Sequence, residues 1–267
     1  MIKSDILIIG AGPVGLFAVF EAGLLKMKCH LIDILPKPGG QCSEIYPKKP
    51  IYDIPAYPEI LADDLVDKLM EQCSQFQPGF TLGERAMTID KQEDNSFIVT
   101  TDKGTKHASP IVVIAGGLGS FEPRKPLIDN ISKFEGFGVE YFIKEPNLFK
   151  DKKIVIAGGG DSALDWAVVL CEIASEVTLI HRRNEFRGAL DSVDKVQQLK
   201  NLNKIKIITP AEVIGLNGEN NLESITIQNF DKSTEDIQTN YFIPLFGLSP
   251  KLGPISSWGL EIEKNAI

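Results

Sequence analysis

An otherwise acidic chain carries a group of arginines in the stretch HRRNEFR, residues 181–187. The chain has 267 residues and a formal net charge of −8, yet Arg182, Arg183 and Arg187 place three guanidinium groups close together. A planar guanidinium can bind two phosphate oxygens at once, which suits arginine to a phosphate group. The stretch therefore predicts a phosphate site, with His181 packing beside the bound nucleotide. A solvated basic turn is the alternative interpretation.

A glycine turn lies upstream of these arginines, between a predicted strand and a predicted helix. Gly158, Gly160 and Ala163 have the spacing G-x-G-x-x-A, which brings a dinucleotide pyrophosphate to the N-terminus of a helix. Asp161 and Ser162 open that helix. The Ser162 hydroxyl either donates to the pyrophosphate or caps the helix. Together with the arginines, which would bind a 2′-phosphate, this turn predicts a site for NADP(H).

A similar turn occurs near the N-terminus, with the spacing G-x-G-x-x-G over Gly10, Gly12, Pro13 and Gly15. Gly10 permits the tight turn, Gly12 lets a pyrophosphate approach, and Gly15 lets the helix pack on the strand. The next predicted strand ends in Asp33, where a carboxylate accepts hydrogen bonds from a ribose diol and repels a 2′-phosphate. This turn predicts a dinucleotide without that phosphate, most simply FAD.

Two dinucleotide sites with different ribose chemistry suggest that NADPH delivers hydride to a flavin. The cofactors carry such chemistry and the protein orients them, so no catalytic side chain is assigned. The scattered His30, His107 and His181 suggest neither a catalytic triad nor a metal site. The four cysteines include no C-x-x-C pair, which argues against a zinc ribbon or a redox dithiol.

Each glycine turn lies between a predicted strand and a predicted helix. Two such units in one chain predict an α/β protein with two Rossmann-like, three-layer ββα domains. The predicted FAD domain is discontinuous, over 1–117 and 240–267, and the NADP(H) domain, 118–239, is inserted into it. Near the N-terminus we expect a strand over Ile6–Ile9, a helix to about Lys26 and a strand over Cys29–Ile32. The apolar pattern then predicts a helix over about 59–75.

Composition restricts the class of protein. A content of 43% hydrophobic and 24% charged residues predicts a packed soluble protein, and the negative net charge argues against nucleic-acid binding. The apolar run 6–25 could be mistaken for a signal peptide or a membrane span. Four glycines and a proline interrupt it, so we interpret it as a strand, turn and helix. Few, scattered cysteines favour a reducing compartment, and we expect a cytoplasmic protein without a membrane partner.

The chain resembles the thioredoxin-reductase-like ferredoxin–NADP reductases. The matching stretches are IIGAGPVGL, GGQCSEIYPKKPIYDIPAYPEI, FEPRK, IAGGGDSALDWA, IHRRNEFR and LGPISSWGLEIEKNAI. The resemblance implies FAD and NADP(H) as cofactors, single-electron transfer to ferredoxin or flavodoxin, and a homodimer. It also implies that Gly39, Gly40 and Gln41 line the FAD, that Tyr46 stacks on the isoalloxazine ring, and that Phe121 marks the crossing into the NADP(H) domain.

The chain departs from this pattern in two ways. The stretch VEYFIKEPNLFKDKK, where thioredoxin reductases carry C-x-x-C, has no cysteine, which excludes a dithiol relay to thioredoxin. Family members also continue past EIEKNAI with a C-terminal FAD-binding segment, so we expect a C-terminally incomplete FAD domain. Two alternatives therefore stay open: an NADPH-dependent, diaphorase-like flavoprotein with another acceptor, and a non-catalytic NADP-binding module.

Overall fold

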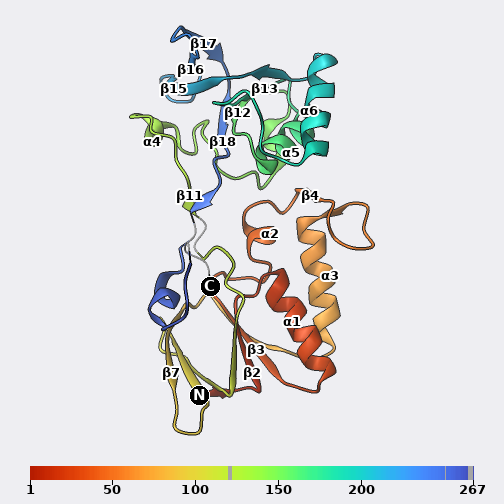
Figure 1. Ribbon diagram of the computed structural model, residues 1–267, viewed down its shortest axis with the longest axis vertical. Coiled ribbons are helices and arrows are strands. Elements are labelled where there is room, and N and C mark those ends of the chain that lie inside the picture. Colours follow the sequence, from red (N-terminus) through yellow and green to blue (C-terminus); the bar gives the residue numbers. More distant parts are fainter. Residues whose placement is uncertain (120–121, 250, 264–266) are drawn as a thin grey trace. The chain divides into compact units, whose positions relative to one another are not determined.

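The chain folds into two compact units. The computed structural model describes residues 1–119, 122–249, 251–263 and 267. The first unit spans Met1–Phe121 together with Pro250–Ile267, and the second spans Glu122–Ser249 (Figure 1). The second unit therefore interrupts the first in the sequence. Both units combine parallel sheets with helices, which confirms the predicted α/β class.

The first unit has fourteen elements in the part of the chain that the structure describes. In chain order they are β1 (Ile2–Lys3), β2 (Ile6–Ile9), α1 (Pro13–Leu24), β3 (Cys29–Asp33), α2 (Gln41–Glu44), β4 (Pro50–Ile51), β5 (Ile60–Leu61), α3 (Ala62–Ser74), β6 (Gly79–Leu82), β7 (Ala86–Lys91), β8 (Phe97–Thr101), β9 (Lys106–Ser109), β10 (Ile111–Ile114) and the 3-10 helix η2 (Gly253–Ser257).

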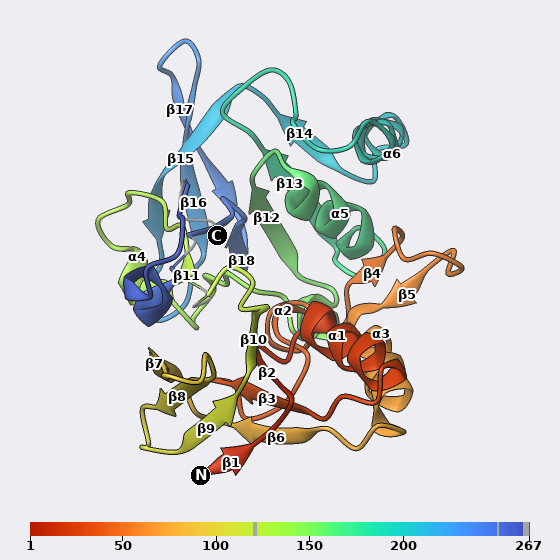
Figure 2. The same ribbon diagram turned by 60° about the horizontal axis from the view of Figure 1, so that its bottom comes forward.

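These elements form three layers. The central sheet is parallel, with the strand order β10-β2-β3-β6. Because side chains alternate along a strand, Ile8 of β2 packs among residues of α1 and α3, whereas Leu7 and Ile9 pack against the second sheet, β1-β9-β8-β7. Figures 1 and 2 show the two helices on one side of the central sheet and β7, β8 and β9 on the other.

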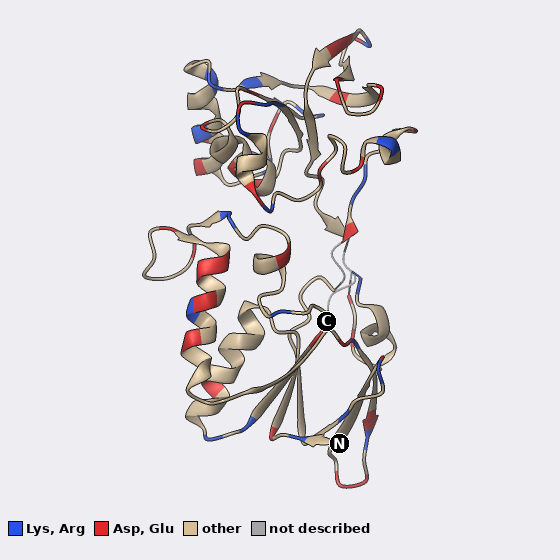
Figure 3. Ribbon diagram, turned by 180° about the vertical axis from the view of Figure 1, so that it is seen from behind, with Lys and Arg blue, Asp and Glu red and all other residues tan. Residues whose placement is uncertain are grey.

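Helix α3 starts later than the apolar pattern predicts. Ile60 and Leu61 form β5, which pairs antiparallel with β4, so the helix begins at Ala62. Its inner side buries Leu65 and Cys73, and its outer side carries the acidic residues visible along the helix in Figure 3. Burial of the apolar side stabilises the helix against the sheet.

Two histidines are buried between the two sheets of the first unit. His30 of β3 and His107 of β9 have ring centroids 4.8 Å apart. The Nε2 atom of His30 lies 2.8 Å from Oγ1 of Thr81, and neither ring nitrogen of His107 has a hydrogen-bond partner among the described residues. Burial, and then the neighbouring His107, lower the pKa of His30 to about 4. Both rings therefore belong to the core in their neutral form.

The second unit repeats the three-layer plan with different strands. Its elements are β11 (Glu122–Pro123), α4 (Ile131–Phe134), the 3-10 helix η1 (Pro146–Phe149), β12 (Lys153–Ala157), α5 (Asp161–Leu170), β13 (Glu176–Ile180), α6 (Leu190–Asn201), β14 (Lys206–Ile208), β15 (Ala211–Asn217), β16 (Ser224–Asn229), β17 (Thr234–Gln238), β18 (Tyr241–Pro244) and β19 (Leu248–Ser249).

A parallel sheet with the order β14-β13-β12-β18 is the middle layer of this unit. Helix α5 packs on β12 and β13, and α6 packs on α5. The antiparallel sheet β15-β16-β17 covers the other face, where Ile225 and Ile227 pack among Val155 and Ile180. Figure 2 shows the helices and the antiparallel sheet on opposite sides of β12 and β13.

The domain boundaries differ from those that the sequence predicts. Residues 240–249, which we expected in the N-terminal domain, lie in the second unit. Strand β18 pairs in parallel with β12, and Phe242 and Ile243 are fully buried in that unit. The strand completes the second unit's sheet because β12 would otherwise be an edge strand with an unpaired backbone.

A membrane-spanning segment was not expected. In the described part of the chain, no helix combines the length and apolar composition needed to cross a bilayer.

Candidate functional site

Two glycines of the first turn are required by the fold itself. Gly10 has φ +108, and an added Cβ would overlap the carbonyl oxygen of Ala115 on the neighbouring strand. A Cβ on Gly15 would overlap the carbonyl oxygen of Gly10, because helix α1 packs closely on β2. These positions need glycine whether or not a ligand binds.

Gly12 has no such constraint from the protein. A Cβ built there would meet only the Cα of Gly40, at 3.8 Å, which is an ordinary contact. Gly12 is also the N-cap residue of α1, and no side chain caps that helix. The first-turn N–H groups therefore face open space at the positive end of the helix dipole, with Pro13 as the first helical residue. This arrangement fits a pyrophosphate.

The carboxylate of Asp33 is held in place by the backbone around it. Its Oδ2 accepts a hydrogen bond from the Ala11 N–H at 2.7 Å, and its Oδ1 accepts one from the Leu35 N–H at 2.8 Å. These bonds fix the carboxylate at the C-terminal end of β3, beside the glycine turn. Each oxygen keeps a free lone pair, so the group can still accept hydrogen bonds from a ribose diol.

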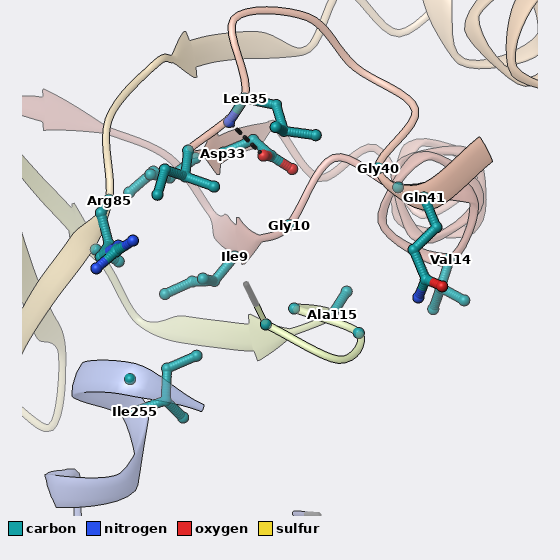
Figure 4. Close-up of a pocket in the computed structure, with 18 of the residues that line it drawn as sticks. Ile9, Gly10, Val14, Asp33, Leu35, Gly40, Gln41, Arg85, Ala115 and Ile255 are labelled. Atoms are coloured by element: carbon teal, nitrogen blue, oxygen red, sulfur yellow. Dashed lines mark hydrogen bonds between the residues drawn. The ribbon is translucent and has the colours of Figure 1, made fainter. Parts of the chain in front are cut away.

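A cavity of about 340 Å³ extends from this turn. It is lined by four of the predicted FAD-contacting residues outside the turn, Asp33, Gly40, Gln41 and Tyr46. Figure 4 shows Gln41 at one end and Arg85 at the other, with Gly10, Ile9 and Asp33 between them. An elongated molecule such as a dinucleotide could extend between these ends.

Sequence reasoning missed several residues that line this cavity. Arg85 lies beside β7, and residues 251–255 reach the cavity from the C-terminal part of the chain. No motif marks Arg85, and the matching stretch that begins at Leu252 was not assigned to a site, because only the packing of distant segments brings these residues to the cavity. Cys42 is buried and also lines the cavity.

Tyr46 is packed against the first unit's core while its side chain lines the cavity. Burial, followed by interactions with Cys42, raises the pKa of Tyr46 to about 12. The phenol is therefore neutral at physiological pH and presents an aromatic ring to the cavity. Lys49 lies 5.8 Å from the centre of this ring.

In the second turn, as in the first, the fold requires one glycine and leaves open space at another. An added Cβ on Gly158 would lie 2.7 Å from the carbonyl oxygen of Leu245 and from the Cβ of Ala163, so the fold requires glycine there. A Cβ on Gly160 would meet nothing within 4 Å. Gly160 is the N-cap of α5 and makes no side-chain cap, so here too open space faces the start of a helix.

The arginine-rich loop is tied to this turn by two hydrogen bonds. The Arg187 N–H donates to the Gly159 carbonyl at 2.6 Å, and the Ala189 N–H donates to Oδ1 of Asp161 at 2.7 Å. Asp161 thus anchors the loop, a role that the sequence did not suggest. The Ser162 side chain is exposed.

Arg182, Arg183 and Arg187 are exposed, and no described residue forms an ion pair or a side-chain hydrogen bond with them. Three unneutralised guanidinium groups near a glycine turn form a local basic site on an acidic protein. Such a site attracts a phosphate group.

His181 is buried beneath this loop, and its ring stacks on Phe186 at a centroid distance of 5.5 Å. Its Nε2 atom has no hydrogen-bond partner among the described residues. Burial, and then the neighbouring Arg187, Arg182 and Arg183, lower the pKa of His181. The ring occupies the space that a Cβ on Gly159 would need, so His181 supports the glycine turn.

Two other expectations concern Phe121 and metals. Phe121, predicted to mark the crossing between domains, lies outside the described residues. Among the residues that the structure does describe, no group of three or more His, Cys, Asp or Glu side chains is arranged to hold a metal ion.

The fold and the two glycine turns define a protein with two units of the dinucleotide-binding type. A family model described as pyridine nucleotide-disulphide oxidoreductase matches residues 4–267. A protein named ferredoxin–NADP reductase from Flavobacterium johnsoniae is 71% identical over 267 residues, which cover all of this chain and 76% of the relative. One from Mesorhizobium japonicum is 49% identical and is covered to 78%.

The chain belongs to the pyridine nucleotide-disulphide oxidoreductases and, within them, to the ferredoxin–NADP reductase family. Solved structures of thioredoxin reductases share its fold. The T. acidophilum thioredoxin reductase has a TM-score of 0.86 at 20% identity, and the match covers 99% of this chain and 84% of that chain. The Lactococcus lactis enzyme has a TM-score of 0.82 at 24% identity, covering 96% and 82%.

Proposed function

We propose that this protein is a flavoprotein oxidoreductase that transfers hydride between NADPH and FAD and then single electrons to ferredoxin. The observation that carries this proposal is the contrast between the two turns. One strand after a glycine turn ends in an oriented carboxylate, Asp33, and the other leads into the exposed guanidinium groups of Arg182 and Arg183. The membership of the ferredoxin–NADP reductase family supports the same conclusion.

In this proposal the first unit holds FAD. The N–H groups at the start of α1, next to Gly12 and Pro13, bind the pyrophosphate. Asp33 accepts hydrogen bonds from the ribose of the adenosine half, and Gly40 and Gln41 lie along the cavity. The neutral ring of Tyr46 packs on the isoalloxazine ring, where it excludes water and orients the flavin.

The second unit holds NADP(H). Gly158 and Gly160 form the turn, and the free N–H groups at the start of α5, near Ser162, bind the pyrophosphate. The guanidinium groups of Arg182, Arg183 and Arg187 bind the 2′-phosphate. Asp161 holds the arginine loop in place through its hydrogen bond with Ala189. The ring of His181 packs against Gly159 of the turn.

When both cofactors are bound, they supply hydride exchange between nicotinamide and flavin and one-electron transfer from the flavin. The chain's own residues select, bind and orient them. The described cysteines Cys29, Cys42, Cys73 and Cys171 are all free. Burial raises the pKa of the Cys42 thiol, so the cysteine that lines the cavity is held as a neutral thiol.

The experiment is anaerobic stopped-flow spectroscopy of the purified holoprotein. NADPH should bleach the flavin absorbance, and ferredoxin or flavodoxin should restore it much faster than a quinone or oxygen does. Faster reoxidation by the quinone would instead favour a diaphorase-like enzyme. A colourless protein that binds NADPH but no added FAD would contradict the proposal and favour a binding module.

The partners and the location of the protein extend the proposal. We infer a homodimer, because the resemblance to ferredoxin–NADP reductases implies one. We also infer a cytoplasmic location without a nucleic-acid or membrane partner, because the chain is acidic overall and few cysteines occur. Lys48 and Lys125, two surface lysines that could contact an acidic ferredoxin, already form ion pairs within the chain. Each lies 2.6 Å from a carboxylate, of Asp63 and Glu135 respectively. Sedimentation of the holoprotein tests the dimer, and subcellular fractionation tests the location.

A further inference from the structure

Arg85 is a cation in the cavity that neither the glycine turns nor the arginine loop explains. It directly precedes β7 and lines the cavity together with Glu84 and Ala86. Figure 4 places it at the end opposite Gln41, beyond Ile9 and Asp33. Because Gly40 and Gln41 lie toward the other end, Arg85 belongs to the part of the cavity on the ribose side of the proposed FAD site.

The backbone on either side of Arg85 is firmly held. Its N–H donates to Oδ1 of Asp102 at 2.9 Å, and its carbonyl accepts from the Asp102 N–H at 2.9 Å. The preceding residues are bound to the segment that carries the ribose carboxylate. The Gly83 N–H donates to the Leu35 carbonyl at 2.9 Å, and the Glu84 N–H donates to the Asp33 carbonyl at 3.1 Å. Arg85 therefore has a fixed position relative to Asp33.

The guanidinium of Arg85 has no ion-pair or hydrogen-bond partner in the described part of the chain. The nearby carboxylates have other partners. Glu84 accepts a hydrogen bond from the Thr101 hydroxyl, Asp102 accepts the Arg85 N–H, and both oxygens of Asp33 accept backbone N–H groups. The planar guanidinium of Arg85 is thus unpaired in a cavity whose lining includes the apolar side chains of Ile9, Leu35 and Ile255.

A flat aromatic ring is the ligand group that suits this environment. Guanidinium groups stack on aromatic faces, and apolar walls favour the same flat surface. A second phosphate is disfavoured, because the carboxylate of Asp33 is fixed nearby and would repel it. In a dinucleotide, the base attached to the ribose is the flat ring that lies next to the ribose carboxylate.

We propose that Arg85 contacts the adenine ring of FAD and so makes the protein retain FAD in preference to FMN. The proposal rests on FAD being the ligand of the first unit. Arg85 is then a specificity residue for the cofactor, separate from the reaction at the flavin end. Removal of its side chain should weaken the binding of adenosine-containing ligands to the first unit and leave the binding of flavins without adenosine unaffected.

The test compares three ligands on apoprotein prepared from the holoprotein. FAD, FMN and ADP are titrated by flavin fluorescence or calorimetry into the wild type, Arg85→Ala, Arg85→Lys and the control Lys91→Ala. The control removes an exposed cation from the other end of the same strand, β7. We expect Arg85→Ala to weaken FAD and ADP by roughly 3- to 30-fold, with FMN unchanged. Arg85→Lys should fall between wild type and Arg85→Ala, because lysine keeps the charge without the plane.

Two outcomes overturn the assignment of Arg85. Arg85→Ala could bind FAD and ADP as tightly as Lys91→Ala does, or it could lose FMN as much as FAD, which would mean a general effect on the fold. Thermal unfolding of the apoproteins separates loss of folding from loss of binding. If the wild-type apoprotein bound neither FAD nor ADP, the proposed function itself would fail, and the inference with it.

Discussion

The two glycine turns have the same spacing, but different residues are required by the fold at each. In the first, Gly10 and Gly15 are fixed by backbone atoms of the protein, whereas in the second Gly158 is fixed by Leu245 and Ala163. In both, the middle glycine, Gly12 or Gly160, has room for a larger residue. The comparison separates glycines that make the turn from glycines that leave space for a ligand.

The residues at the ends of the two strands that follow the turns carry opposite charges. The first ends in a carboxylate with two backbone hydrogen bonds. The second leads into a loop of uncommitted guanidinium groups, tied to the turn by Arg187 and Ala189. In the proposed function, the same backbone plan selects two dinucleotides through the side chains at the strand end.

The largest effect is expected from the double variant Arg182→Ala with Arg183→Ala. Each charged hydrogen bond contributes about 1.5–3 kcal/mol, and exposure favours the lower end, so preference for NADPH over NADH should fall roughly 100-fold. The measurement is the ratio of kcat/KM for the two nucleotides. Activity with NADH is the internal control, and an unchanged ratio would show that the 2′-phosphate binds elsewhere.

The buried histidine pair distinguishes the first unit from the second. Folding lowers the pKa of His30 from 6.5 to about 4 and also lowers that of His107, so the unfolded chain binds more protons in this range. The stability contributed by the neutral pair is complete above pH 6.5 and is lost as the pH falls toward 4, by roughly 2–3 kcal/mol. Glu84 favours protonation of His107, and the chain's amino terminus opposes it.

The two tryptophans allow each unit to be followed separately. Trp258 lies in the first unit and Trp166 in the second. In urea titrations at pH 7.5 and pH 4.5, a Trp166→Phe protein should report a larger acid destabilisation than a Trp258→Phe protein. Adding His30→Gln with His107→Leu should reduce that difference. Equal pH dependence of the two units would refute the role of the pair.

Asp33→Asn tests the carboxylate of the first turn. The amide oxygen can keep one backbone hydrogen bond, but the negative charge that strengthens the bonds to a ribose diol is lost. Affinity for FAD should fall about 10-fold or more, corresponding to one charged hydrogen bond of about 1.5–3 kcal/mol. The readout is the FAD content after dialysis, with NADPH affinity as the control. Full retention of FAD would mean that Asp33 stabilises the conformation of the glycine turn and does not bind the ribose.

Gly12→Ala and Gly160→Ala sharpen the distinction between the two kinds of glycine. Both variants should fold, and each should weaken only its own dinucleotide by about 10-fold, because overpacking against a ligand typically costs about 1–3 kcal/mol. Gly10→Ala is the matched contrast, since its Cβ would overlap backbone and should destabilise the first unit. Thermal unfolding and ligand titration together decide between these outcomes. A misfolded Gly160→Ala protein would contradict the interpretation.

The smallest effect is expected from Asp161→Ala, which removes the acceptor for the Ala189 N–H. One hydrogen bond contributes about 1 kcal/mol, so KM for NADPH should rise roughly 3- to 5-fold, with little change for NADH. Asp161→Asn keeps an acceptor oxygen and should restore most of the NADPH affinity. If both variants change NADH and NADPH equally, Asp161 acts on the turn and not through the arginine loop.

Much of the architecture could be predicted because it is local. Strand β2 has the predicted bounds, helix α1 ends two residues before the expected Lys26, and β3 extends one residue past the expected Ile32 to include Asp33. Apolar runs interrupted by glycine and proline fix such elements within a few residues. The start of α3 was predicted three residues early, because Ile60 and Leu61 form a strand that pairs with β4.

The sequence by itself determined the two turns and the charges that follow them, since glycine conformation and strand period depend on neighbouring residues. Only the tertiary structure decided that β18 belongs to the second unit, that Asp161 anchors the arginine loop, and that Arg85 and residues 251–255 reach the same cavity as Gly12. These contacts join segments far apart in the chain. They depend on how sheets and loops pack against one another, which no short stretch of sequence specifies.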